Sequence, residues 1–255
     1  MRDFGALILF YKEVIQASLR SDSSGGQRRK LILEQVAEVY QRSLSTVLFA
    51  GFFVGAILTL QFNLMLIDYE AQSLMGGLTA SACIREVGPL IISFLLAGKI
   101  GAYTAAELGT MRVTEQVDAI ECLGTNPLEY LVVPRFIAIV TAAVLLLVIG
   151  LMVSLLGSML VASLAANVNP LQFLASIPRF AGLGVFAAGM LKSLVYGLIV
   201  AGVSCHQGFT ATGGARGVGQ AVTWAAIYTN LYIVFANFFL GQVLEVAHVL
   251  WGDLS

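Results

Sequence analysis

The residues of this chain that could do chemistry are a few charged side chains inside or beside long apolar segments. Lys99 and Glu107 lie within one such segment, and Glu115, Asp118 and Glu121 repeat every three residues after it. An ionisable residue at membrane depth is costly and indicates a functional position by default. Glu107, eight residues after Lys99, lies on roughly the same helical face. A structural ion pair for Lys99 and an interfacial position for Glu107 remain open alternatives.

These charges do not form a catalytic site. The two histidines, His206 and His248, are far apart, and no Ser/His/Asp set, paired carboxylates, H-E-x-x-H or Walker motif is present. The three cysteines are isolated, show neither metal spacing nor a disulfide framework, and are interpreted as packing residues. We therefore predict no catalytic residue, no metal site and no cofactor bound by this chain. Lys192 and Glu245, also in apolar segments, fit a structural role equally well.

The elements that must position these charges are membrane-spanning helices. The chain is 58% hydrophobic and 11% charged, which excludes an ordinary soluble domain. Crossing the hydrocarbon core takes about 20 apolar residues. Five segments are long enough, near 44–67, 87–108, 136–162, 182–204 and 221–247. We therefore predict an all-α integral membrane protein, with an N-terminal interfacial region over 1–43 and a five-helix transmembrane domain over 44–255.

The distribution of lysine and arginine predicts the orientation. Ten of these residues fall on the side of the N-terminus, and two, Arg85 and Arg179, fall near span ends on the other side. Cytoplasmic loops carry the excess of positive charge, so the N-terminus is expected in the cytoplasm and the C-terminus outside. An odd number of spans agrees with that orientation. The absence of a signal or transit peptide favours a bacterial inner membrane.

The region before the first span is predicted to be amphipathic. Apolar residues recur at spacings of three and four over 1–20, which favours a helix in the plane of the membrane interface, although packing on a neighbouring helix is the alternative. This stripe comprises Phe4, Leu7, Ile8, Tyr11, Val14, Ile15 and Leu19. A polar break follows over 21–27, and helix resumes at Arg28. Gly51 and Gly55 then form a small-x-x-x-small pair that would allow close helix packing.

The connections between spans are predicted to be short. Residues 68–86 favour a short helix rather than an open loop, and 167–170 favour a turn. Residues 205–219 are a glycine-rich turn that lacks the form of a phosphate-binding loop.

The connection after the second span favours a discrete short helix over 114–124. Thr114 is the candidate N-cap, Gly124 is the candidate C-terminal stop, and Asn126-Pro127 prevents continuation. The apolar side of this helix would rest on span ends, while its acidic side projects into the cytoplasm. A solvated acidic face with no partner is the alternative.

Three stretches of the sequence resemble a known family. REVGPL…AGKIGAYTAAELGTMRVTEQVDAIECLGTNPLEYLVVPR (85–135) is similar to the signature region of MlaE/YrbE-type permeases, the membrane subunits of ABC transporters that work with MCE-domain proteins. FFVGAILTLQ (52–61) resembles the end of that family's first span, and CHQGFTATGGARGVGQAVT (205–223) resembles its last cytoplasmic turn. The resemblance covers about residues 30–245.

The resemblance implies a homodimeric permease with two cytoplasmic ATPase subunits, which bind ATP and Mg²⁺, and a periplasmic MCE protein. The implied substrate is phospholipid or another lipid moved between inner and outer membranes, in the service of outer-membrane lipid asymmetry. It also implies that 114–124 is the coupling helix that enters an ATPase groove. The matching positions there are Thr114, Glu115, Gln116, Asp118, Ala119, Glu121, Gly124 and Pro127. Polar positions of the implied lipid path are Gln61, Lys99 and Glu107, and the family has arginine more often where Lys99 stands.

Two functions of other classes compete with this one. An ion-coupled secondary transporter would need intramembrane acids and broken helices in repeated halves, and no internal repeat is found. A structural membrane anchor of a complex is the second. Copurification of an ATPase separates the permease from the secondary transporter, and ATP-dependent lipid movement separates it from the anchor.

Overall fold

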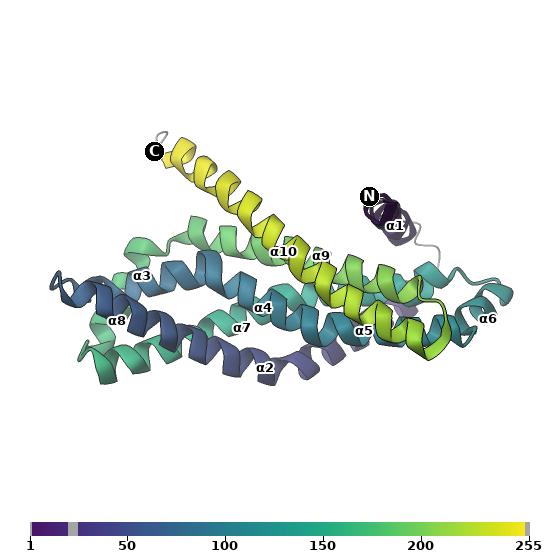
Figure 1. Ribbon diagram of the computed structural model, residues 1–255. Helices are drawn as coiled ribbons and strands as arrows, with labels where there is room; N and C mark the ends of the chain where they lie inside the picture. Colours follow the sequence, from purple (N-terminus) through teal and green to yellow (C-terminus); the bar gives the residue numbers. More distant parts are fainter. Residues whose placement is uncertain (1, 20–24, 253–255) are drawn as a thin grey trace. The chain divides into compact units, whose positions relative to one another are not determined.

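The computed structural model describes residues 2–19 and 25–252, which are helical with short turns and contain no strand. Figure 1 labels the helices in chain order. The α-helices are α1 (Arg2–Leu19), α2 (Gly25–Ile67), α3 (Met75–Ala82), α4 (Gly88–Leu96), α5 (Ala102–Val113), α6 (Gln116–Cys122), α7 (Val133–Ala165), α8 (Pro170–Phe180), α9 (Leu183–Phe209) and α10 (Gly214–Gly252). A 3₁₀ turn, η1 (Gln72–Leu74), precedes α3.

Five helical segments are long and apolar enough to cross a membrane: 29–67, 72–113, 128–165, 183–209 and 214–246. The predicted number and order of spans are therefore confirmed, and the chain is a multi-pass membrane protein. Each helix extends beyond its predicted apolar segment on at least one side because polar residues continue the same hydrogen-bonded run. The predicted helix within 68–86 is also confirmed, since α3 lies there.

Three π-helical turns interrupt the second and third spanning segments: η2 (Cys83–Val87), η3 (Ala97–Gly101) and η4 (Leu128–Val132). Isolated π turns inside helices occur frequently at functional sites. All three turns carry charge, since Arg85 and Glu86 belong to η2, Lys99 belongs to η3 and Glu129 belongs to η4. A regular α-helix with 3.6 residues per turn is expected over the second spanning segment. The structure instead places Arg85, Glu86 and Lys99 of that segment in π turns.

The chain divides into two compact units, which we describe separately. Unit 1 comprises Met1–Ser43, Phe94–Ala143 and Gly197–Ile233, and unit 2 comprises Leu44–Ser93, Val144–Tyr196 and Val234–Ser255. Every boundary between them falls inside an α-helix. The predicted division at residue 43 remains a prediction.

In unit 1, α1 packs one face on the unit's own helices. Its buried residues are Leu7, Phe10, Val14 and Ala17. The Tyr11 hydroxyl donates to the Leu198 carbonyl at 2.9 Å, and burial raises the pKa of Tyr11 above its usual value. The predicted apolar stripe therefore divides: part of it packs inward, whereas Ile8 and Ile15 are about half exposed, at 54% each.

Two predicted breaks in unit 1 are wrong in extent. α2 begins at Gly25 rather than Arg28, and residues 20–24 of the predicted break lie outside the described residues. The glycine-rich turn is confined to 210–213, because α9 continues through Phe209 and α10 begins at Gly214. Gly213 and Gly214 adopt φ of 87° and 67°, the left-handed backbone for which glycine is suited.

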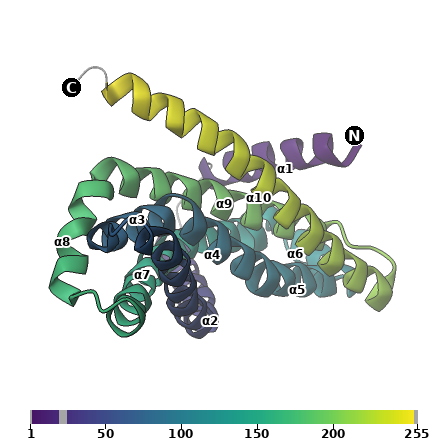
Figure 2. The ribbon, with the colours of Figure 1, turned by 60° about the vertical axis from the view of Figure 1, so that its left-hand side comes forward.

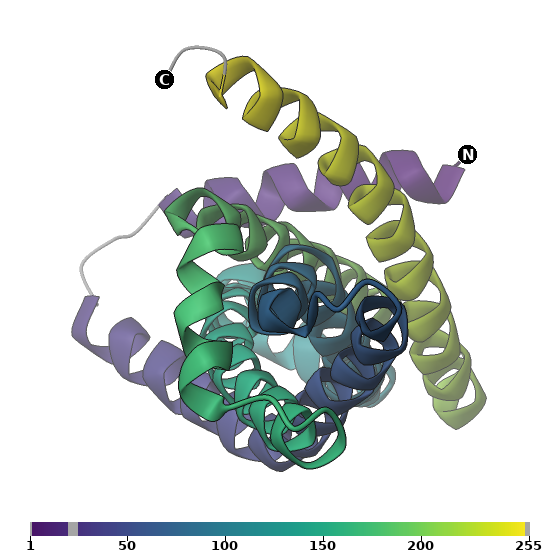
Figure 3. The ribbon, with the colours of Figure 1, turned by 90° about the vertical axis from the view of Figure 1, so that its left-hand side faces the viewer.

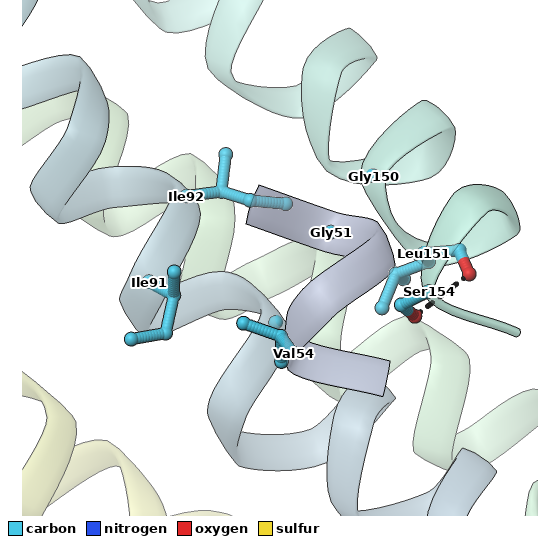
Figure 4. Close-up of a pocket in the computed structure, with 8 residues that line it drawn as sticks. Gly51, Val54, Ile91, Ile92, Gly150, Leu151 and Ser154 are labelled. Carbon is cyan, nitrogen blue, oxygen red and sulfur yellow. Dashed lines mark hydrogen bonds between the residues drawn. The ribbon is translucent and has the colours of Figure 1, made fainter. Parts of the chain in front are cut away.

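In unit 2, α2 and α7 cross at very short range. A Cβ at Gly51 would lie 2.7 Å from the Gly150 carbonyl oxygen, and one at Gly55 would collide with the Ser154 carbonyl. Figure 4 shows α4 closing the same contact with Ile91 and Ile92, leaving a void of only about 10 Å³. The predicted small-x-x-x-small pair is thus a real packing contact, made within this chain.

The helix α8 of unit 2 was not predicted. It lies beside α3 in Figures 2 and 3, and the Ser176 hydroxyl accepts the Gly77 N–H at 2.9 Å. Asn169 caps α8 by accepting the Leu171 N–H at 2.9 Å, and Pro170 is its first residue. An Asn-Pro pair is a helix start signal, and the sequence analysis interpreted it only as a turn.

Candidate functional site

The short helix α6 follows the second spanning segment, as predicted, but it begins differently. The Thr114 hydroxyl donates to the Thr110 carbonyl at 2.8 Å, so Thr114 ends α5 rather than capping α6. The N-cap residue is Glu115, with φ of 62° and no side-chain capping bond. The predicted Thr114 cap is therefore wrong, because a threonine at the end of a helix can bond back to the preceding turn. The helix spans Gln116–Cys122 rather than 114–124.

The end of α6 agrees with the sequence analysis. Gly124 has φ of 77°, its N–H donates to the Glu121 carbonyl at 2.9 Å, and the Thr125 N–H donates to the Ile120 carbonyl at 3.3 Å. These two bonds form a Schellman motif, which confirms Gly124 as the C-terminal stop. Asn126 then accepts the Leu128 N–H at 3.0 Å.

Pro127 opens the run that becomes η4 and α7. The Asn-Pro pair that stops α6 thus also starts the next helix.

Two ion pairs connect α6 and its neighbours in unit 1. Arg112 Nη1 at the end of α5 lies 2.5 Å from Asp118 Oδ1 of α6. Arg135 of α7 makes a two-point contact with Glu107 of α5, Nη2 to Oε1 at 3.0 Å and Nε to Oε2 at 3.2 Å. Arg135 is buried and also donates to the Leu131 carbonyl. Together the pairs fix α6 to α5, and α5 to α7.

The predicted coupling residues of α6 are exposed, and they differ in whether the side chain is held by an ion pair within unit 1. Glu115, Gln116 and Glu121 are exposed, and Leu123 beyond them is 83% exposed. Asp118 is exposed as well, but its carboxylate is held by Arg112. The Cys122 thiol is exposed too, contrary to its interpretation as a packing residue, whereas the other two cysteines are buried.

The Glu107–Arg135 pair should be sensitive to a change that keeps the charge. We expect Arg135→Lys to lower the free energy of unfolding by about 2 kcal/mol, because an ammonium cannot make the two-point contact. Arg112→Lys is the matched control, and at this exposed pair the loss should stay below about 1 kcal/mol. Thermal unfolding in detergent measures both, and equal losses would contradict the assignment.

The three predicted lipid-path residues are not assembled into one site. Gln61 is exposed on α2 in unit 2, whereas Lys99 and Glu107 belong to unit 1. Lys99 is exposed, and Glu107 is occupied by Arg135.

Among the described residues, the most deeply buried charge is Lys192, for which the sequence leaves a functional and a structural role open. In unit 2, the Lys192 side chain on α9 is 0% exposed, and its Nζ lies 2.5 Å from Glu86 Oε1 of η2. Gly241 of α10 faces both, since a Cβ there would lie 3.9 Å from each of these atoms. The only sign of this buried charge in the sequence was that Lys192 lies within an apolar span, and Lys99 lies within an apolar span as well. Sequence alone does not show which lysine faces the interior.

Two further polar contacts hold α10 in unit 2. The Tyr196 hydroxyl donates to Asn237 Oδ1 at 2.6 Å, and Arg85 of η2 pairs with Glu245 of α10. Five polar or charged side chains besides Lys192 therefore connect η2, α9 and α10. Among the described residues, no group of three or more His, Cys, Asp or Glu side chains could hold a metal ion.

Comparison with known proteins identifies this arrangement. The family described as Permease MlaE matches residues 32–243. A probable ABC transporter permease protein of Synechocystis sp. is 39% identical over 220 residues, covering 86% of this chain and 84% of the relative. One of Rickettsia typhi is 35% identical, covering 84% and 83%. The chloroplastic protein TRIGALACTOSYLDIACYLGLYCEROL 1 of Arabidopsis thaliana is 35% identical, covering 82% of this chain and 60% of the relative. With five candidate spans and a short interspan helix, the chain belongs to the MlaE permease family and is an ABC transporter permease.

Proposed function

We propose that this permease moves lipids, phospholipids in the first instance, between the inner and outer membranes of a bacterium. It does so with two ATPase subunits that bind ATP and Mg²⁺, and with an MCE-domain protein on the outer side. The name of the Arabidopsis relative refers to a galactolipid, which supports a lipid substrate. The result would be an asymmetric outer membrane.

The proposed assembly is a homodimer in the inner membrane, with the N-terminus in the cytoplasm and the C-terminus in the periplasm. The excess of lysine and arginine on the N-terminal side supports this orientation. Two spanning helices, α2 and α10, expose large apolar side chains, among them Phe49, Phe53 and Phe238. Such faces require lipid or a second copy of the chain as their neighbour.

The observation that carries the proposal is the attachment of α6. This helix ends in a Schellman motif, is joined to α5 by the Arg112–Asp118 pair, and presents Glu115, Gln116 and Glu121 outward. A short acidic helix fixed in this way transmits a movement of a cytoplasmic ATPase to the second and third spanning helices. We therefore assign the coupling role to the exposed residues of α6 and an anchoring role to Asp118.

Reversing the exposed charge tests this assignment. We expect Glu115→Lys combined with Glu121→Lys to weaken ATPase binding at least about tenfold and to abolish ATP-dependent lipid transfer between liposomes. Glu13→Lys, an equally exposed glutamate on α1, is the control and should leave both unchanged. Full binding and transfer in the double variant would remove the coupling role.

Lipid movement itself needs a separate measurement, because coupling and substrate are independent claims. The unmodified permease, reconstituted with its ATPase and MCE partners, should move fluorescent phospholipid only when ATP is hydrolysed. Transfer driven by an ion gradient without ATP would favour the secondary transporter. No transfer under either condition, with the complex intact, would favour a structural anchor.

A further inference from the structure

Unit 1 contains a pocket of about 420 Å³ beside α6, and its lining extends from the coupling residue Glu121 to residues outside α6. Its inner wall, defined as the lining residues that are at least partly buried, includes the apolar Val117, Pro127 and Phe209. Its edge, defined as the exposed lining residues, includes Glu121, Thr210 and Thr212. These residues come from α6, the start of η4 and the connection between α9 and α10. The pocket is therefore lined by two parts of the chain, one around α6 and one between α9 and α10, that are more than 80 residues apart in sequence.

The size and lining of the pocket suit protein side chains. Val117 is 1% exposed, so the inner wall is a firm part of the unit's core. A volume of about 420 Å³ admits a large aromatic side chain together with a neighbour. Interface residues that contribute most to binding are aromatic or arginine side chains that fill such pockets.

The charge at the edge specifies the partner further. Arg112 lines the pocket, but its guanidinium is neutralised by Asp118 at 2.5 Å. Glu121 makes no ion pair with any residue that the structure describes. The edge is therefore net acidic, and Leu123, two residues after Glu121 in the chain, is 83% exposed. A complementary surface carries an apolar or aromatic side chain beside a lysine or arginine.

We propose that this pocket receives an aromatic or apolar side chain of the ATPase subunit, with a neighbouring basic side chain paired to Glu121. This rests on the proposed function, in which an ATPase binds α6. The ATPase then holds α6 and the α9–α10 connection together, rather than α6 alone. Its movement reaches the fourth and fifth spanning helices directly, as well as the second and third.

Filling the pocket is the first test, performed on the purified permease with its ATPase. Thr212→Trp places a large side chain at the edge, and we expect it to lower ATPase affinity at least about tenfold. Thr223→Trp is the matched control, because Thr223 is exposed on α10 but does not line the pocket. Unchanged ATPase affinity in the Thr212→Trp variant would overturn the proposal. Elution of the variant at the same position as the unmodified permease verifies that it is folded.

Crosslinking separates failure of this proposal from failure of the proposed function. In a Cys122→Ser background, we expect both Thr212→Cys and Gln116→Cys to crosslink to the ATPase with a short bifunctional reagent. Crosslinking from Gln116→Cys alone would overturn the pocket while leaving the coupling role of α6 intact. Crosslinking from neither position would overturn both.

Discussion

Replacing Glu86 with leucine will destabilise this permease more than replacing Lys192 with methionine, although the two residues form one ion pair. Lys192 is 0% exposed and Glu86 is 43% exposed. Glu86→Leu leaves an ammonium in the interior with no counter-charge, which costs about 3–5 kcal/mol of folding free energy. Lys192→Met leaves a carboxylate that water can reach or a proton can neutralise, so its cost should be about 1 kcal/mol.

A double-mutant cycle makes this asymmetry decisive. The combined Glu86→Leu and Lys192→Met variant should be more stable than Glu86→Leu alone, because the uncompensated charge is removed. Thermal unfolding in detergent, followed by the loss of the monodisperse elution peak, measures all three variants. Lys99→Met, at an exposed lysine in the same spanning segment as Glu86, is the control and should cost less than Glu86→Leu. Equal losses of unfolding free energy in the two single variants would show that the Lys192 side chain is not buried as described.

Adding one methyl group at Gly55 should be nearly as damaging. A Cβ there would collide with the Ser154 carbonyl of α7, and a backbone atom cannot turn aside as a side chain can. Either α2 and α7 separate or a helix shifts along its neighbour. We expect Gly55→Ala to lower the free energy of unfolding by about 3 kcal/mol, the upper part of the usual range for overpacking.

Gly184→Ala provides the matched control for this prediction. Apart from its chain neighbours and the adjacent backbone of α9 itself, no atom lies within 4 Å of a Cβ built at Gly184. Alanine favours helix over glycine by about 1 kcal/mol, so this variant should be neutral or slightly stabilised. The same unfolding assay compares the two, and a Gly55→Ala variant as stable as Gly184→Ala would mean that α2 and α7 do not cross at this distance.

The sequence predicts well those features that depend on composition and local chemistry. The five spans follow from apolar length, and the stop of α6 follows from Gly124 and Asn126-Pro127. Thr114 was assigned the wrong role because its hydroxyl can bond either to the helix before it or to the one after it. The local sequence contains both possibilities, and only the geometry decides between them.

The partners of the charged residues could not be predicted, because pairing joins positions far apart in sequence. Glu107 forms an ion pair with Arg135, and Lys192 forms one with Glu86, at sequence separations of 28 and 106 residues. Lys99 and Lys192 look alike in sequence, since both interrupt an apolar span. The π turns also change the angular position of side chains, so a regular 3.6-residue period cannot assign their faces.

The contact between Tyr11 and Leu198 sets an order of events during synthesis of the chain. Leu198 lies 187 positions after Tyr11, so α1 is made before its docking surface on α9 exists. At ordinary rates of translation the delay is roughly 10 to 40 s. During that time the apolar residues of α1 must be covered by something else, and the membrane surface is the neighbour at hand. Helix α1 therefore reaches its final position only after α9 has been made.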